Sequence, residues 1–182
     1  MNPNPKFRLQ GLMFASLVFI ADQIVKYAML GSLQLKERGV IHIVSFFDLR
    51  YAENRGVSMS FLTADSDGER WALVALTTVI AAGVGVWMWR EKLRGDVLAL
   101  SLVLGGALGN IVDRVRYGYV VDYADLHFGA FRPFYIFNLA DACISIGVLI
   151  LLARAFLIGD KDAGRGPDVQ ETASNADIVE KS

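Results

Sequence analysis

The chain has 182 residues, of which 54% are hydrophobic and 20% charged, and its formal net charge is −1 at pH 7. This length suits one domain, but a mean hydropathy of +0.40 is too high for an ordinary soluble one. The near-zero net charge offers no basic surface for nucleic acid. A single cysteine excludes an internal disulfide framework and a cysteine-built zinc site, and the two histidines leave little for a metal centre.

Long apolar stretches predict four membrane-spanning helices, because a span needs about 20 mostly apolar residues. Their approximate bounds are 9–30, 71–89, 97–113 and 138–158. The first stretch also has features of a secretory signal, but Asp22 and Gln23 interrupt it and three more spans follow, so we expect a membrane helix. The predicted fold class is therefore a mainly α membrane protein, with one domain over residues 1–158.

Basic residues indicate how the chain crosses the membrane. Three groups fall on the same side if both termini are cytoplasmic, which is the orientation that the positive-inside rule favours. The two outer connections also carry basic residues, but mixed with acidic ones. The polar, acidic segment 159–182 is predicted to be a disordered cytoplasmic tail. The three groups are Lys6 and Arg8; Arg90, Lys92 and Arg94; and Arg154, Lys161 and Arg165.

The connections on the outer side contain strand-like sequences. The region of about residues 37–62 is rich in β-branched and aromatic residues and has a turn signal at Asn54-Arg55-Gly56. A second such stretch, YGYVVDY, runs from Tyr117 to Tyr123 between the third and fourth spans. We therefore expect a small antiparallel β-sheet on the extracytoplasmic surface.

The third span carries Ser101, Gly105 and Gly109 at four-residue spacing. Small residues at this spacing let another helix approach closely in lipid. The third helix is therefore predicted to lie at the centre of the bundle.

Polar residues within the spans share one depth. A charged side chain at the centre of a membrane helix costs at least about 2.5–3.5 kcal/mol, so such residues are expected to have a structural or functional role. In the predicted orientation they fall near the outer boundary, and Asp122, in the connection before the fourth span, can fold back to the same level. These residues are Asp22 in the first span, Asn110, Asp113 and Arg114 at the end of the third, and Asn138 and Asp141 at the start of the fourth.

The residues present disfavour several kinds of active site. No Gly-x-Ser-x-Gly or His-Glu-x-x-His sequence occurs, and no serine is singled out to form a Ser–Lys pair with Lys26. Paired aspartates remain, because two carboxyl groups that share a proton can activate water on one side and protonate on the other. A proton-coupled transporter component and a non-catalytic scaffold are alternatives, although a proton relay should place carboxylates at several depths.

Five ordered motifs carry a family resemblance. They are ADQIVK at Asp22, NRG at Asn54, GGALGNIVDR from Gly105 to Arg114, GYVVDY from Gly118 to Tyr123 and FNLADACISIG from Phe137 to Gly147. Together they resemble the bacterial lipoprotein signal peptidases, also called signal peptidase II, over nearly the whole chain up to about Arg154. The chain departs from the family pattern at Val57, where a smaller alanine is expected.

The resemblance implies a four-helix membrane aspartic peptidase with an extracytoplasmic β-cradle. It implies that Asp122 and Asp141 are the catalytic pair and that no metal or organic cofactor is needed. The implied substrates are diacylglyceryl-modified prolipoproteins, cleaved just before the lipidated cysteine near the periplasmic face of the bacterial inner membrane. Other implied partners are membrane lipids and a cyclic-peptide inhibitor of the globomycin type, but no nucleic acid, and the chain is expected to be a monomer. The residues implied in substrate binding or support are Asp22, Asn54, Asn110, Asp113, Arg114 and Asn138.

Four expectations concern single residues. Asp113 is expected to form a structural ion pair with the adjacent Arg114, and Asp125 is expected to be a solvated loop residue. Cys143 is expected to be a small packing residue. Asp22 is expected to be structural or to contact substrate rather than to be catalytic.

Overall fold

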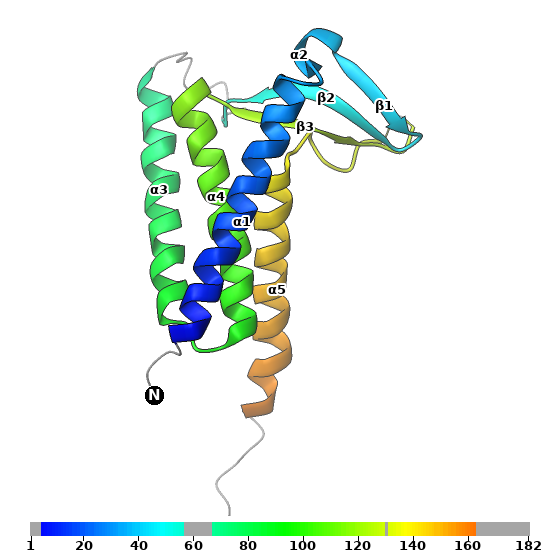
Figure 1. The fold of residues 1–182 in the computed structure, drawn as a ribbon. Coiled ribbons are helices and arrows are strands. Elements are labelled where there is room, and N and C mark those ends of the chain that lie inside the picture. Colours follow the sequence, from blue (N-terminus) through cyan, green and yellow to red (C-terminus); the bar gives the residue numbers. More distant parts are fainter. Residues whose placement is uncertain (1–4, 57–66, 130, 163–182) are drawn as a thin grey trace, which may run out of the picture. The chain divides into compact units, whose positions relative to one another are not determined.

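The computed structural model describes residues 5–56, 67–129 and 131–162. The described residues up to Leu151 form one compact unit, to which all contacts below belong, and the residues from Leu152 form a second unit. Long helices alternate with a short helix and three strands along the chain (Figure 1). The elements are α1 Pro5–Leu30, α2 Leu35–Arg38, β1 Val40–Val44, β2 Phe47–Asn54, α3 Asp67–Arg90, α4 Arg94–Tyr117, β3 Val120–Leu126 and α5 Leu139–Asp162.

The prediction of four membrane helices is confirmed. Within the described residues, segments long and apolar enough to cross a membrane are Lys6–Leu30, Gly68–Arg90, Arg94–Tyr117 and Leu139–Leu157. The part of the predicted tail from residue 163 onward lies outside the described residues, so its predicted disorder stays a prediction.

Helix α1 shows that the bundle is built for a lipid solvent. Its exposed face is apolar, whereas its buried face ends in two charged residues, which is the reverse of a helix on a soluble protein. The spacing of three or four residues places each set on one side of the helix. The exposed set includes Leu9, Met13, Leu17, Ile20 and Ile24, and the buried set is Gly11, Ala15, Val18, Asp22 and Lys26.

Small residues on α4 allow α1 and α5 to approach it closely. A Cβ atom placed on Gly105 would lie 2.5 Å from the Ala15 carbonyl oxygen of α1. A Cβ atom placed on Gly106 would lie 2.5 Å from the Ala140 carbonyl oxygen of α5. The predicted central place of this helix follows from these contacts on two of its sides, because helices in lipid associate chiefly by close packing.

The predicted antiparallel sheet is present, but its third strand comes from a distant part of the chain. The strand order is β1-β2-β3, and both pairings are antiparallel. The turn between β1 and β2 lies at residues 45–46. The predicted turn at Asn54 instead ends β2, where Asn54 Oδ1 accepts a hydrogen bond from the Gly56 N–H at 3.0 Å. Residues 57–62 of the predicted β region, including Val57, lie outside the described residues.

Strand β3 connects α4 with α5 and fixes the start of α5. Gly118 ends α4 with φ +84°, a left-handed conformation that glycine adopts without strain, and this reverses the chain into β3. At the other end of β3, Ala124 and Phe137 exchange backbone hydrogen bonds of 2.8 and 3.0 Å. The residue after Phe137 is Asn138, so β3 holds the residue from which α5 begins.

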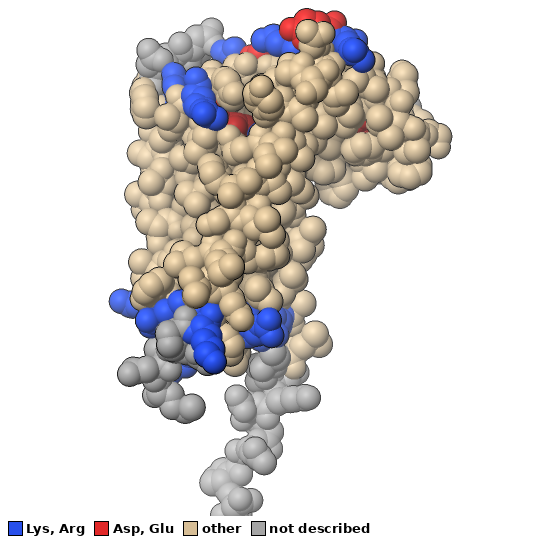
Figure 2. Space-filling view, in the orientation of Figure 1, with Lys and Arg blue, Asp and Glu red and all other residues tan. Residues whose placement is uncertain are grey.

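The two ends of the bundle carry different charges. Figure 2 shows Lys and Arg gathered at the end where α1 begins, whereas basic and acidic side chains lie together at the end that carries the sheet. At the former, here called the basic end, Arg8 Nε donates to the Trp89 carbonyl oxygen at 2.9 Å and its guanidinium lies 4.8 Å from the Trp89 ring centre. Arginine and tryptophan both favour the membrane interface. The opposite end is here called the sheet end.

We predict that Gly105→Ala destabilises the protein by about 1–3 kcal/mol, because the added methyl group overpacks the contact with α1. Gly83→Ala on α3 is the matched control, since a Cβ atom there meets nothing within 4 Å and should leave stability unchanged or slightly raised. Reversible unfolding in mixed micelles measures both. Equal stability of the two variants would contradict the close α1–α4 contact.

Candidate active site

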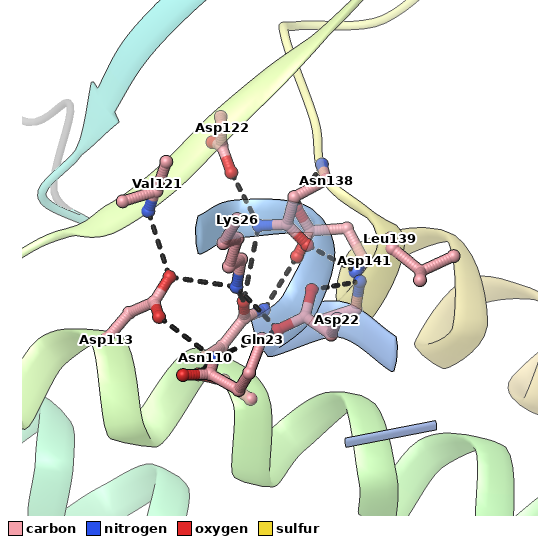
Figure 3. Close-up of polar contacts among 12 residues, drawn as sticks. Asp22, Gln23, Lys26, Asn110, Asp113, Val121, Asp122, Asn138, Leu139 and Asp141 are labelled. Carbon is pink, nitrogen blue, oxygen red and sulfur yellow. Dashed lines mark hydrogen bonds and ion pairs between the residues drawn. The ribbon is translucent and has the colours of Figure 1, made fainter. Parts of the chain in front are cut away.

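Lys26 lies at the centre of a buried polar cluster at the sheet end. Its Nζ lies 2.9 Å from Asp22 Oδ2 on the same helix and 2.8 Å from Asp113 Oδ2 on α4. It also donates to Asn110 Oδ1 at 3.2 Å. The three charged side chains are at most 3% exposed. Buried charges require such pairing, because burial of an isolated charge costs several kcal/mol. Figure 3 shows these side chains converging from separate elements.

The two carboxylates of this cluster also hold neighbouring elements. Asp22 Oδ1 accepts a hydrogen bond from the Ala140 N–H in the first turn of α5 at 3.0 Å. Asp113 Oδ2 accepts one from the Val121 N–H on β3 at 3.1 Å. Gln23 Nε2 lies 3.2 Å from both Asp22 Oδ2 and Asp113 Oδ1. The cluster therefore joins α1, α4, α5 and β3 at one point.

The first turn of α5 has all of its backbone donors satisfied. The first four N–H groups of a helix have no partner within the helix and need acceptors elsewhere. The Leu139 N–H donates to the Tyr123 hydroxyl at 3.1 Å, and the Asp141 N–H donates to Asn138 Oδ1 at 2.9 Å. In return, the Asn138 N–H donates to Asp141 Oδ2 at 3.3 Å, which completes a reciprocal cap. The position of Asp141 is thus set by the start of its own helix.

Two asparagines connect Asp122 with Asp141. Asn138 Nδ2 donates to Asp122 Oδ1 at 2.6 Å and lies 3.2 Å from Asn110 Oδ1. Asn110 Nδ2 donates to Asp141 Oδ1 at 2.8 Å. The residues predicted as a catalytic pair, which are 19 positions apart in the chain, therefore belong to one hydrogen-bond network, as Figure 3 shows.

Asp122 differs from the other buried aspartates in its electrostatic surroundings. Burial, with the nearby Asp141 carboxylate adding to it, raises the pKa of Asp122 to about 7, although Asn54 and Asn138 act the other way. Among the described residues, no ion pair joins Asp122 or Asp141 to Lys, Arg or His. Their side-chain hydrogen-bond partners include the amides of Asn138 and Asn110, which carry no charge that would hold either carboxyl group in its ionised form.

Both aspartates border hollows on the surface of the sheet end. Asp122 lies in the wall of a pocket of about 440 Å³. Asp141 lies in the wall of an apolar pocket of about 360 Å³ that extends along α5 to Ser145 and Ile146. A polar chain in the first pocket could therefore reach Asp122, and an apolar chain in the second could reach Asp141. The first pocket is lined by Ala52, Glu53, Asn54, Arg55, Gly56, Asp122, Tyr135 and Ile136.

The structure brings the predicted polar residues together but contradicts two expectations about single residues. Asp113 pairs with Lys26, not with Arg114, whose Nη1 makes a long 3.5 Å bond to the Asn110 carbonyl oxygen of its own helix. Adjacent helical residues point in different directions, which explains the error. Asp125 is not a solvated loop residue, because it lies in β3 with its side chain fully buried between Arg50 and Arg132.

Three further residues of the cluster were not predicted from the sequence as site residues. Lys26 follows Asp22 by four positions, a spacing that signals a helical ion pair. Gln23 and Tyr123 offer no such signal, because their roles depend on which elements pack together. Cys143 is partly buried in α5. Within the described residues, no three His, Cys, Asp or Glu side chains gather as a metal site would require.

Comparison with known proteins identifies the family. The model of the signal peptidase (SPase) II family matches residues 14–157. The chain belongs to this family. It is 58% identical to the lipoprotein signal peptidase of Sphingopyxis alaskensis over 83% of this chain and 87% of that protein. It is 56% identical to the lipoprotein signal peptidase of Rhizorhabdus wittichii over 93% of this chain and 94% of that protein.

A solved structure agrees with this assignment. A bacterial membrane enzyme matches with a TM-score of 0.69 and 26% sequence identity, over 88% of this chain and 94% of that chain. The predicted family and the predicted fold, four membrane helices with a small antiparallel sheet, are thereby confirmed. The chain is a peptidase of a membrane-spanning family.

We predict that Lys26→Met destabilises the fold by about 3–5 kcal/mol, because it leaves two buried carboxylates without a cation. The triple variant Lys26→Met, Asp22→Asn, Asp113→Asn should recover much of this loss. Lys36→Met, which removes an exposed lysine from a surface pair with Glu53, should change stability little. Unfolding in mixed micelles compares the variants, and a stable Lys26→Met single variant would contradict the central role of Lys26.

Proposed function

We propose that the chain is an aspartic endopeptidase that removes signal peptides from diacylglyceryl-modified prolipoproteins by cleaving just before the lipidated cysteine. The observation that carries this proposal is the hydrogen-bonded link between Asp122 and Asp141 through Asn138 and Asn110. Among the described residues, neither aspartate forms an ion pair with Lys, Arg or His, unlike Asp22 and Asp113. The curated relatives are lipoprotein signal peptidases by name, which supports the substrate class.

In the proposed mechanism Asp122 begins protonated and Asp141 begins ionised. The raised pKa of Asp122 favours its acid form near neutral pH. Since the pair holds one proton in this proposal, Asp141 is then the carboxylate. Asp141 takes a proton from water as the oxygen attacks the scissile carbonyl carbon, while Asp122 gives its proton to the carbonyl oxygen.

Collapse of the resulting intermediate restores both groups. One hydroxyl of the tetrahedral intermediate returns a proton to Asp122 as the carbon–nitrogen bond breaks. The departing nitrogen takes the proton held by Asp141 and leaves as the amine of the lipidated cysteine. The two aspartates therefore end in their starting states, and the net reaction consumes one water and one peptide bond.

Substrate positioning follows from the proposed orientation, with the basic end in the cytoplasm and the sheet end at the periplasmic face of the inner membrane. A signal peptide has its basic end inside and its cleavage site at the outer interface, which matches the depth of the pair. The apolar pocket beside Asp141 suits lipid chains that arrive from the bilayer. We propose that Asn54, beside Asp122, and Arg114, near the Gly56 turn, hold substrate carbonyl groups.

We predict that Asp122→Asn and Asp141→Asn each lower cleavage of a diacylglyceryl-modified precursor peptide by at least about 1,000-fold, because a pair without its shared proton cannot transfer protons in both directions. The exposed residue Glu37 provides the control Glu37→Gln, which should cleave normally. A gel-shift assay, with and without a globomycin-type inhibitor, measures cleavage. Activity retained in either aspartate variant would rule out the proposed pair.

We predict that kcat/KM falls as pH rises through about 7, because the proposed acid form of Asp122 is lost above its raised pKa. Below this pH Asp122 keeps its proton, so this group imposes no loss there. The measurement is a pH–rate profile with a lipidated peptide, with thermal unfolding at each pH to exclude denaturation. An alkaline limb that begins two or more pH units higher would contradict the assignment of Asp122 as the acid.

A further inference from the structure

A second charged cluster lies on the part of the sheet beyond the aspartate pair. Its centre is the buried Asp125, three residues after Asp122 on β3. Arg50 Nε lies 3.2 Å from Asp125 Oδ2, and Arg132 Nε lies 3.1 Å from Asp125 Oδ1. One carboxylate thus holds two guanidinium groups side by side, and the three charges leave an excess of one positive charge.

The outer parts of both arginines remain available to a ligand. The side chains of Arg50 and Arg132 are 40% and 46% exposed, while the Asp125 side chain is 0% exposed. Their contacts with Asp125 use the Nε atoms, and the described residues supply no hydrogen-bond acceptor to the Nη groups. Guanidinium groups in this state are suited to phosphate oxygens.

Asp48 does not cancel this positive charge directly. It lies opposite Asp125 in the strand pairing, but its carboxylate is directed to histidines. His42 Nδ1 lies 2.8 Å from Asp48 Oδ1, and His127 Nε2 lies 3.1 Å from Asp48 Oδ2. Asp48 and Asp125 therefore have separate partners, and of these two aspartates the arginines form ion pairs with Asp125.

The arginines line a hollow at the level of the lipid headgroups. They border a pocket of about 710 Å³ whose other wall is residues 133–136. That segment comes shortly before Leu139, where the fourth membrane span begins, and it lies beneath the sheet beside the start of α5 (Figure 1). Phe134 and Tyr135 are 62% and 97% exposed there, as expected of aromatic side chains at a membrane interface.

We propose that Arg50 and Arg132, held by Asp125, bind the phosphate group of an anionic membrane phospholipid beside the aspartate pair. The level of the pocket favours a lipid over free phosphate or a soluble acidic peptide, because headgroup phosphates are concentrated where membrane spans end. The pocket shares Tyr135 and Ile136 with the hollow of Asp122 and shares Phe134 with that of Asp141. The bound lipid is thus a neighbour of the site and separate from its chemistry.

The test measures binding of short-chain phosphatidylglycerol to the purified full chain in neutral detergent by native mass spectrometry. The double variant Arg50→Gln, Arg132→Gln should bind at least about tenfold more weakly, since two arginine–phosphate contacts are removed. Arg116→Gln is the matched control, because Arg116 is exposed at the end of α4 on the same membrane side. It should bind within about twofold of the unchanged chain.

Two further arms identify the source of the phosphate. Short-chain diacylglycerol, which lacks phosphate, should bind weakly, and inorganic phosphate at the lipid's concentration should not displace it. Since loss of both arginines could unfold the sheet, Arg50→Lys, Arg132→Lys serves as a second variant that keeps two charges against Asp125. It should unfold at the temperature of the unchanged chain and still lose binding, because an ammonium lacks the planar fork.

Four results would overturn the proposal. They are unchanged binding by a folded double variant, an equal loss in Arg116→Gln, diacylglycerol that binds as well as phosphatidylglycerol, and displacement by inorganic phosphate. None of these results bears on cleavage by the aspartate pair, since lipid binding is measured without substrate.

Discussion

A lysine buried between two buried aspartates is the interaction on which the rest of the structure depends. Neither sign of charge is stable alone in an apolar bundle. Lys26 and Asp22 belong to α1 and Asp113 belongs to α4, so these helices must bury the three groups together. The same two carboxylates accept backbone N–H groups of α5 and β3. The contacts that neutralise these three charges therefore also position α1, α4, α5 and β3 relative to one another.

The aspartates of the sheet end divide by the kind of partner they have. Asp22 and Asp113 face a lysine, Asp125 faces two arginines and Asp48 faces two histidines. Asp122 and Asp141 face the amides of Asn138 and Asn110. An amide orders a carboxyl group in either protonation state, whereas a cation favours one. This difference separates groups that hold the fold from groups able to exchange protons.

The sequence predicts the depth of a residue in the membrane better than it predicts which other residue it contacts. The spans and the positions of Asp22, Asn110 and Asp141 near their ends are sufficient to predict one polar site, because membrane thickness fixes the level of each residue. Whether Asp113 meets Arg114 or Lys26 depends on how α4 is rotated against α1, which the small residues of α4 decide only in the packed bundle. Asp125 was wrongly predicted for a similar reason, since β3 pairs with a strand whose residues lie 66 to 79 positions earlier.

The hydrogen bond from the Ala140 N–H to Asp22 joins residues 118 positions apart, in the first and last membrane spans. When only the first three spans have entered the bilayer, Lys26, Asp22 and Asp113 are present, but the first turn of α5 is not. Asp22 then lacks the Ala140 N–H that it binds in the complete fold. Contacts of such long sequence separation form late. The protein thus cannot act on passing precursors during its own synthesis, because the proposed peptidase centre is complete only after the final span has entered the bilayer.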